Sequence, residues 1–336
     1  MRHLKKGFTM IMGVILIAGL VGITVPRAEA AKYVMKFAHN SPPKPDMLYT
    51  AAATTFQNYL RIYTAGEADT QIFPSSQLGK DSIAAKKVQL GSVQMQTVVT
   101  NNISRFDRRI DVYTLPFLFK NFRSAAKVLN SDIGKTIAEN YRKKSGIRIL
   151  SSWPCSFRKM ANSKHPILKP SDLGDLRMRI AKNPVMVETY KSFGGSTIGM
   201  APTEVFSALA QKVVDGQDGG TTWQWSMKFY EVQKYMSVTN HQLTVCVITI
   251  NDKYFSGLPK NIQKGVQKAA TDSTAWLTSY SETLDKELVG KFEAKGLKID
   301  YPDLKPFVDA VKPVYKKFGE KLGGMTLINK ILDMQK

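Results

Sequence analysis

Two arginines stand beside strand-like segments, where they could bind an organic acid. Arg158 directly follows the apolar run Trp153–Phe157, and Arg179 lies within Leu176–Ile180, which reads LRMRI. Alternation in the second run places its apolar residues on one face of a strand and its arginines on the other. A guanidinium offers two parallel N–H donors that match a carboxylate. Arg179 at a strand end could therefore bind an acid, although a surface or structural ion-pair role stays open for each arginine.

Catalytic signatures are missing from the sequence. It contains no G-x-S-x-G elbow, no Walker A loop and no H-E-x-x-H motif. The four histidines (His3, His39, His165 and His241) are isolated from one another, and we expect His165 and His241 to have structural roles. The sequence therefore predicts a protein that is not an enzyme, with neither a metal nor another cofactor.

The chain is strongly basic, with a formal net charge of +21. Such a charge raises three possible partners: nucleic acid, an anionic surface or a small anionic ligand. No zinc-finger spacing, RNP-like aromatic motif or arginine-rich tail is present, so we expect no nucleic acid partner. The basic residues are scattered, mostly on predicted helix faces, where they would be solvated and could steer acids toward a cleft.

The first thirty residues have the pattern of an export signal. Arg2, Lys5 and Lys6 are followed by an apolar run over Phe8–Val25, and Ala28–Ala30 supplies the small residues of a cleavage site. An uncleaved anchor is the alternative, and the apolar run is near the lower limit for crossing a bilayer. We predict cleavage after Ala30 and a periplasmic location.

Strand-like and helical segments alternate along the rest of the chain. The strand-like segments are Lys32–His39, Thr70–Phe73, Val93–Val99, Ile147–Trp153 and Leu176–Ile180. The helical segments are Met47–Tyr63, Ile83–Leu90, Val185–Phe193 and Val205–Val213. This alternation predicts an α/β protein with parallel or mixed sheets and crossover helices.

A much longer helical pattern follows in the C-terminal third. Apolar residues recur at helical spacing from Ile262 to Phe292 without a proline. At ~1.5 Å per residue the helix would be about 45 Å long, which exceeds a small lobe, so we expect it to brace two lobes. Cys155 and Cys246 lie in apolar strand-like runs; we expect buried thiols, although a disulfide is compatible with export.

Several of these segments together resemble one family. The runs Phe73–Met95 and Ser171–His241, which include FPSSQLG, SDLGDLRMRI, MAPTEVFSALAQKVVDGQDGG, EVQKY and TNH, are similar to DctP-type TRAP solute-binding proteins. The similarity extends from about Lys32 to the C-terminus. It implies a two-lobed periplasmic binding protein fold with hinge strands and a long helix spanning both lobes. The implied lobes are 32–155 plus 244–283 and 156–243 plus 284–336.

The resemblance also implies a function. The protein would be a monomeric receptor that binds an organic acid between its lobes and delivers it to the small and large membrane subunits of a TRAP transporter. A ligand-binding sensor for a kinase or chemoreceptor is the main alternative. An exported lyase or hydrolase and a binder of anionic polymers are two further alternatives.

Individual site residues follow from the same resemblance. Arg179 matches the family's carboxylate-binding arginine, and Arg158 matches a second arginine that often contacts ligand. Three positions depart from the family pattern: Gly219 replaces a frequent asparagine, Pro202 a frequent aromatic residue and Lys86 a frequent acidic residue. We hypothesise a roomier pocket in which Trp223 or Trp225 replaces the missing packing, although either tryptophan could belong to the core.

Overall fold

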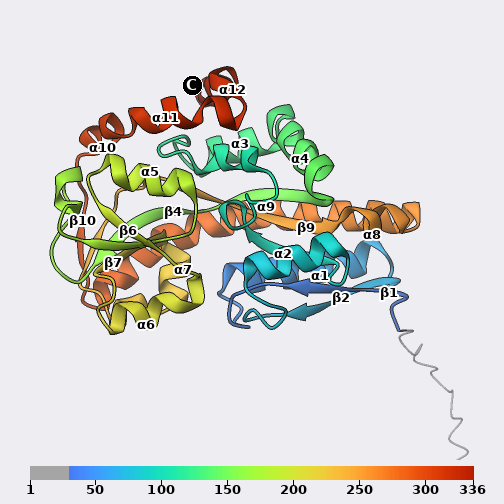
Figure 1. The fold of residues 1–336 in the computed structure, drawn as a ribbon. Helices are drawn as coiled ribbons and strands as arrows, with labels where there is room; N and C mark the ends of the chain where they lie inside the picture. Colours follow the sequence, from blue (N-terminus) through green and yellow to red (C-terminus); the bar gives the residue numbers. More distant parts are fainter. Residues whose placement is uncertain (1–29) are drawn as a thin grey trace, which may run out of the picture. The chain divides into compact units, whose positions relative to one another are not determined.

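The computed structural model describes residues 30–336, so the predicted signal peptide, apart from Ala30, lies outside the described residues. Figure 1 shows strands at the centre with helices packed around them. None of the helices within residues 30–336 combines the length and apolar character that crossing a membrane requires.

The first lobe is built on strands from distant parts of the chain. Its strand order is β2-β1-β3-β9-β4. Pairs β1/β2 and β1/β3 are parallel, whereas β3/β9 and β9/β4 are antiparallel. The bounds are β1 Tyr33–Ala38, β2 Ala68–Phe73, β3 Met95–Val99, β4 Ile147–Asn162 and β9 Leu243–Asn251. Helices α1 (Leu48–Tyr63) and α2 (Asp81–Leu90) are the crossovers, and α2 ends at Gly91, whose φ of +83° favours glycine.

The second lobe is built on the order β4-β7-β5-β6, with β8 pairing β4 and β10 pairing β8. Its strands are β5 Arg177–Ile180, β6 Ser196–Gly199, β7 Gly216–Gly220, β8 Tyr235–Ser237 and β10 Lys298–Asp300. Its helices are α5 Pro184–Ser192, α6 Val205–Ala210 and α7 Thr221–Ser226. Leu176, Met178 and Ile180 are buried, as the alternating pattern predicted.

Strand β4 belongs to both lobes. Its residues 147–157 pair with β9, and residues 158–162 pair with β7. The register shifts between Pro154 and Ser156, which marks an irregularity where the strand passes from one sheet to the other. A single strand therefore carries the chain across the junction.

Helix α9 (Lys260–Ala294) also contacts both lobes, since it packs on α1 and β4 and on α7 and β10. Its 35 residues confirm the predicted long helix. The remaining helices are α3 Phe122–Asn130, α4 Asp132–Ser145, α8 Asp252–Gly257, α10 Lys305–Ala310, α11 Lys312–Phe318 and α12 Gly324–Asp333. Short 3-10 helices lie at Thr100–Asn102, Arg108–Thr114, Pro170–Leu173, Pro202–Glu204, Phe229–Glu231 and Glu320–Leu322.

The predicted fold class is confirmed: the chain is an α/β protein of two lobes, joined by crossing strands and by the long helix α9. Two segments differ from prediction. Strand β4 continues nine residues past Trp153. The helix predicted over Val205–Val213 ends at Ala210, because Lys212 adopts a left-handed φ of 56° and the N–H of Val213 turns back to the Ala208 carbonyl. The two cysteines are buried and not bonded to each other.

A buried ion pair connects β4 to α9 at the place where the two lobes meet. Lys159 Nζ on β4 lies 2.6 Å from Asp285 Oδ2 on α9, and their side chains are 2% and 8% exposed. The other Asp285 oxygen accepts hydrogen bonds from Ser156 and Thr221. Burial lowers the pKa of Lys159, although Asp285 opposes the shift. The pair therefore links β4, α7 and α9 at one point.

Removing one partner of this pair should strongly destabilise the fold. In Asp285→Ala, the Lys159 ammonium would stay buried without a counterion, and we expect unfolding free energy to fall by ~3–5 kcal/mol. Glu282→Ala on the same helix removes an exposed pair with Lys286 and should cost less than about 0.5 kcal/mol. Urea denaturation measures both variants, and equal losses would contradict the proposed importance of the buried pair.

Candidate ligand-binding cleft

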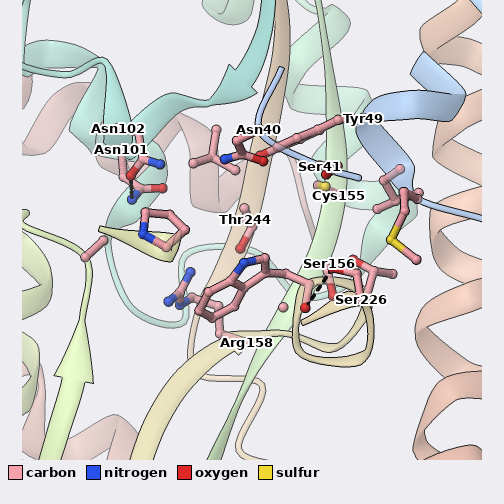
Figure 2. A pocket seen from close by; sticks show the side chains of 18 of the residues that line it. Asn40, Ser41, Tyr49, Asn101, Asn102, Cys155, Ser156, Arg158, Ser226 and Thr244 are labelled. Atoms are coloured by element: carbon pink, nitrogen blue, oxygen red, sulfur yellow. Dashed lines mark hydrogen bonds between the residues drawn. The ribbon is translucent and has the colours of Figure 1, made fainter. Parts of the chain in front are cut away.

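A cavity of about 690 Å³, including its open mouth, lies between the lobes. Its first-lobe wall includes Asn40, Met47, Leu48 and Asn101, and its second-lobe wall includes Arg179 and Trp223. Residues of the crossing strands, among them Cys155, Arg158 and Thr244, form its floor (Figure 2). The cavity thus combines apolar side chains with a few polar groups, the composition of a small-molecule site.

Arg179 is the buried cation of this cavity. Strand β5 places it opposite the apolar face, and the residue is only 2% exposed. Its Nη2 donates to the Met200 carbonyl at 2.6 Å, but its Nε has no hydrogen-bond partner. Among the described residues no carboxylate pairs with it, and burial together with Arg158 lowers its pKa to about 9. An anion in the cavity would relieve this unpaired charge.

The guanidinium of Arg179 also lies over an aromatic face. Its central carbon is 5.0 Å from the Trp223 ring centroid. Such stacking holds a guanidinium plane in position without neutralising it. Trp223 therefore orients the cation and leaves its N–H donors available.

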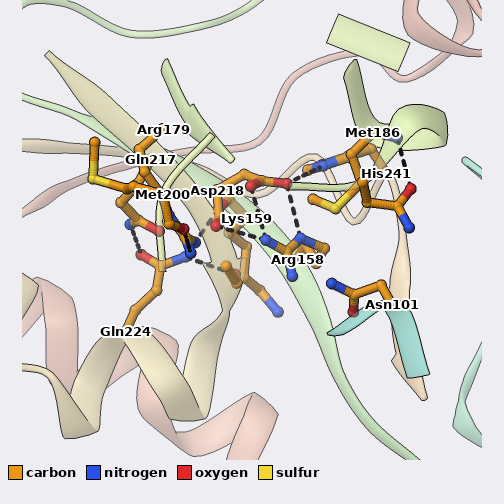
Figure 3. Close-up of polar contacts among 12 residues, drawn as sticks. Asn101, Arg158, Lys159, Arg179, Met186, Met200, Gln217, Asp218, Gln224 and His241 are labelled. Carbon is orange, nitrogen blue, oxygen red and sulfur yellow. Dashed lines mark hydrogen bonds and ion pairs between the residues drawn. The ribbon is translucent and has the colours of Figure 1, made fainter. Parts of the chain in front are cut away.

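Arg158, by contrast, already has a counterion. Its Nε and Nη2 each lie 2.8 Å from an oxygen of Asp218, and both side chains are buried (Figure 3). Burial opposes the charges, but the pair still raises the pKa of Arg158 and lowers the pKa of Asp218. The pair is thus a neutral unit beside the cavity.

His241 completes this unit. Its Nε2 lies 3.2 Å from Asp218 and its Nδ1 lies 2.8 Å from the Thr239 hydroxyl. Burial lowers the pKa of His241, so the ring is neutral at neutral pH. Because a carboxylate only accepts, Nε2 carries the proton and Nδ1 accepts from Thr239. The histidine that the sequence assigned a structural role fixes the position of Asp218, and through it that of Arg158.

On the opposite wall, three asparagines form a hydrogen-bonded group around Asp81, which the sequence did not predict. Nδ2 of Asn40 and of Asn102 donate to Asp81 Oδ2, at 2.9 Å and 2.7 Å, and Nδ2 of Asn101 donates to Asn102 Oδ1 at 3.0 Å. Burial raises the pKa of Asp81 to about 6. Single asparagines near chain turns are common, so only the fold reveals that these three meet.

Four of the seven residues proposed from sequence line the cavity, and three do not. Arg158, Arg179, Pro202 and Trp223 line it. The other three are Gly219, Lys86 and Trp225.

Gly219 lies behind Trp223, and a Cβ at this position would come within 2.4 Å of the Trp223 ring. It therefore lets that ring pack against β7. Trp225 packs instead on Phe292 of α9, with ring centroids 5.4 Å apart. Lys86 is exposed on α2, where it donates to Gln89. None of these three residues lines the cavity.

Charged residues surround the mouth of the cleft. Lys80, which precedes α2, forms an ion pair of 2.6 Å with Glu204 of the second lobe, and each side chain is half exposed. Arg105, Arg108 and Lys182 line an adjoining cavity, which shares Arg179 and Asn101 with the cleft. This arrangement joins the lobes at the rim and surrounds the entrance with positive charge, which attracts anions.

Solved structures share this architecture. A TRAP periplasmic solute-binding protein from Polaromonas sp. JS666 bound to D-erythronate is 30% identical, with a TM-score of 0.85 over 89% of this chain and 98% of that one. The sugar acid binding protein of Advenella mimigardefordensis in complex with galactonate is 26% identical, with a TM-score of 0.85 over 91% and 99%.

Sequence comparison agrees with the structural one. The C4-dicarboxylate-binding periplasmic protein of Rhodobacter capsulatus is 28% identical over 91% of this chain and 92% of that protein. Residues 37–322 match the family model described as bacterial extracellular solute-binding protein, family 7. The resemblance predicted from sequence is thus confirmed, and the chain belongs to the DctP family of TRAP solute-binding proteins.

Proposed function

We propose that this protein binds the carboxylate of an organic acid on Arg179 and delivers the acid to the small and large membrane subunits of a TRAP transporter. The observation that carries the proposal is a buried guanidinium inside a cavity with no protein carboxylate paired to it among residues 30–336. Relatives named for erythronate, galactonate and C4-dicarboxylates support an acid as ligand.

The ligand would act by joining the two lobes. We place the lobe boundaries at 155/156, 243/244 and 283/284, which fall at the β4 irregularity, at the start of β9 and beside Asp285. A bound acid would contact both walls only when the cleft is closed, so it would favour closure. The closed protein would then dock on the membrane subunits. It would act as a monomer in the periplasm after cleavage behind Ala30, without a cofactor and without catalysing a reaction.

The first prediction concerns Arg179. A library of organic acids identifies ligands by thermal shift, since an acid at about 100 times its Kd adds about 2.7 kcal/mol of stability. Arg179→Met and Arg179→Lys should then weaken binding of the best acid roughly a hundredfold or more, measured by calorimetry. Without ligand, Arg179→Met should be at least as stable as wild type, because the unpaired buried charge is gone.

Arg177→Met is the matched control. Arg177 lies on the same strand, but its half-exposed side chain pairs with Asp215 outside the cavity. This variant should bind the acid like wild type. Near-native affinity in Arg179→Met would refute the assignment of the carboxylate to Arg179.

A second prediction separates the two tryptophans. Trp223→Ala removes the ring over Arg179 and should weaken binding roughly tenfold. Trp225→Ala removes core packing against Phe292, so it should lower thermal stability while the remaining folded protein keeps its affinity. Calorimetry and thermal unfolding of both variants test this, and the reverse pattern would show that Trp225 contacts the ligand.

A third prediction concerns Asp81, which holds the asparagines of the first-lobe wall. Burial raises its pKa from 3.8 to about 6, so the folded protein takes up a proton at higher pH than the unfolded chain does. The stability contributed by this group therefore increases as the pH falls from about 6 to about 4.

The variant Asp81→Asn lacks this titration. Between about pH 7 and about pH 4, the unfolding free energy of wild type should rise relative to the variant by up to about 3 kcal/mol. Denaturation at several pH values measures the difference. Other titrating groups, such as Asp111, cancel because they are the same in both proteins, and a pH-independent difference would contradict the prediction.

A further inference from the structure

We propose that Cys155 and Cys246 form a redox-active dithiol at the floor of the cleft, and that its oxidation to a disulfide weakens the binding of ligand. The thiol chemistry does not depend on the proposed function, whereas the effect on binding rests on the acid site at Arg179. The sequence contains two cysteines in all, so every thiol reaction of the protein belongs to this pair.

The two cysteines are neighbours on the crossing strands. Cys246 of β9 lies directly opposite Trp153 of β4, and Cys155 follows two residues later on β4. Both side chains belong to one apolar core, together with Trp153 and Tyr49. Burial and the adjacent Cys155 thiol raise the pKa of Cys246. The pair therefore joins the two strands that lead from one lobe to the other.

Only one of the two residues is open to the cavity. Cys155 lines it together with Tyr49, as Figure 2 shows. Cys246 is fully buried and does not line the cavity; its Sγ lies 4.0 Å from the Tyr49 hydroxyl. A reagent that enters the cleft can therefore react with Cys155, whereas Cys246 reacts only through its neighbour.

This arrangement permits a balanced reaction in which an organic disulfide is the oxidant. Cys155 loses its proton, and its thiolate attacks one sulfur of the oxidant, forms a mixed disulfide and releases one thiolate. Cys246 then loses its proton and attacks Cys155 Sγ, which forms the Cys155–Cys246 bond and releases the second thiolate. The protein gives up two electrons and two protons, and the oxidant becomes two thiols. The periplasm, the proposed location of the protein, is a compartment in which disulfides form and persist.

Closing this bond would displace β4. The register makes the two cysteines diagonal neighbours, whose Cα atoms lie about 7–8 Å apart in a regular antiparallel pair. A disulfide requires a Cα separation of about 4.4–6.8 Å. Oxidation must therefore draw Cys155 toward Cys246. The irregularity between Pro154 and Ser156 is the place where β4 can yield.

The next residue transmits this movement to the second lobe. Ser156 Oγ accepts a hydrogen bond from the N–H of Thr221 at 2.8 Å. Thr221 begins α7, the helix that carries Trp223 and so places its ring over Arg179. A displacement of β4 would shift that ring and the guanidinium relative to each other. The oxidised protein should therefore bind ligand more weakly.

Thiol chemistry tests the first half of the proposal. 2-Hydroxyethyl disulfide is a suitable oxidant for the reduced protein, because it is small and uncharged and does not need the acid site. Mass spectrometry should show the loss of two hydrogen atoms with no reagent retained, and a digest should contain a peptide pair joining Cys155 to Cys246. Dithiothreitol should restore both thiols. Two unreacted thiols, or a wild-type protein that keeps the reagent bound, would overturn the proposal.

Two variants test the order of the steps. Cys246→Ala should stop at the mixed disulfide, with one half of the reagent retained on Cys155. Cys155→Ala should leave Cys246 unmodified, because Cys246 does not line the cavity. Equal modification of the two variants, with circular dichroism confirming that both are folded, would overturn the role of Cys155 as the attacking thiol. The wild-type result does not depend on whether either variant folds.

Calorimetry of the oxidised and the reduced wild-type protein tests the effect on binding. With the best acid from the library, oxidation should weaken binding at least about tenfold, and dithiothreitol should restore it. The control is the double variant Cys155→Ala/Cys246→Ala, whose affinity the oxidant should not change. Equal affinity of the two wild-type forms would overturn the effect on binding. Failure of every acid to bind would overturn the proposed function and this effect with it, whereas the thiol measurements, which use no acid, would still decide the first half.

Discussion

The protein is organised around a positive charge that it buries without neutralising. A desolvated guanidinium is unfavourable, and most proteins pair it with a carboxylate of their own. Here a neighbouring arginine, Arg158, receives that pairing from Asp218, whereas Arg179 receives a backbone carbonyl and an aromatic face. The difference between these two arginines makes the two walls of the cleft unlike: an unpaired cation lies on one lobe, and uncharged asparagines lie on the other.

The scaffold must hold these walls at a defined separation and still let them move apart. Strand β4 and helix α9 are the long elements shared by both lobes, and the buried Lys159–Asp285 pair fastens them at the crossing point. Because a buried pair loses much of its stability when its geometry changes, the crossing point is expected to stay intact while the outer parts of the lobes rotate. Rigidity is thus concentrated at the junction, close to the floor of the cavity.

Much of this fold could be predicted from sequence, because its elements have clear periodic patterns. The alternation at Leu176–Ile180 predicted the orientation of Arg179, and the apolar stripe from Ile262 predicted the bracing helix. The hydrogen-bonded group of asparagines around Asp81 could not be predicted. Asn40, Asn101 and Asp81 come from three separate segments, and they function together only because β1, β3 and α2 meet at one edge of the cavity. Thr244 was missed because β9 is buried along its whole length, so no alternation distinguishes the residue that faces the cavity.

The position of Lys86 and the two tryptophans shows the limit of residue-by-residue transfer. The family pattern placed Lys86 on a helix and motivated the hypothesis that Trp223 or Trp225 packs on the ligand, but neither specifies which side chain turns toward the cavity. Gly219 decides this for Trp223, since only a residue without a side chain leaves room for the ring against β7.

The ion pair between Lys80 and Glu204 has a kinetic consequence. The pair joins the two lobes at the rim of the cleft, and both of its side chains are half exposed, so it adds little to the stability of the closed form. The two side chains would nevertheless have to separate before the lobes open and release a ligand. Dissolved ions weaken such a contact far more than they weaken the interior of the site. The residence time of a captured molecule should therefore shorten as the surroundings become saltier, and release would respond to the ionic conditions outside the cell membrane.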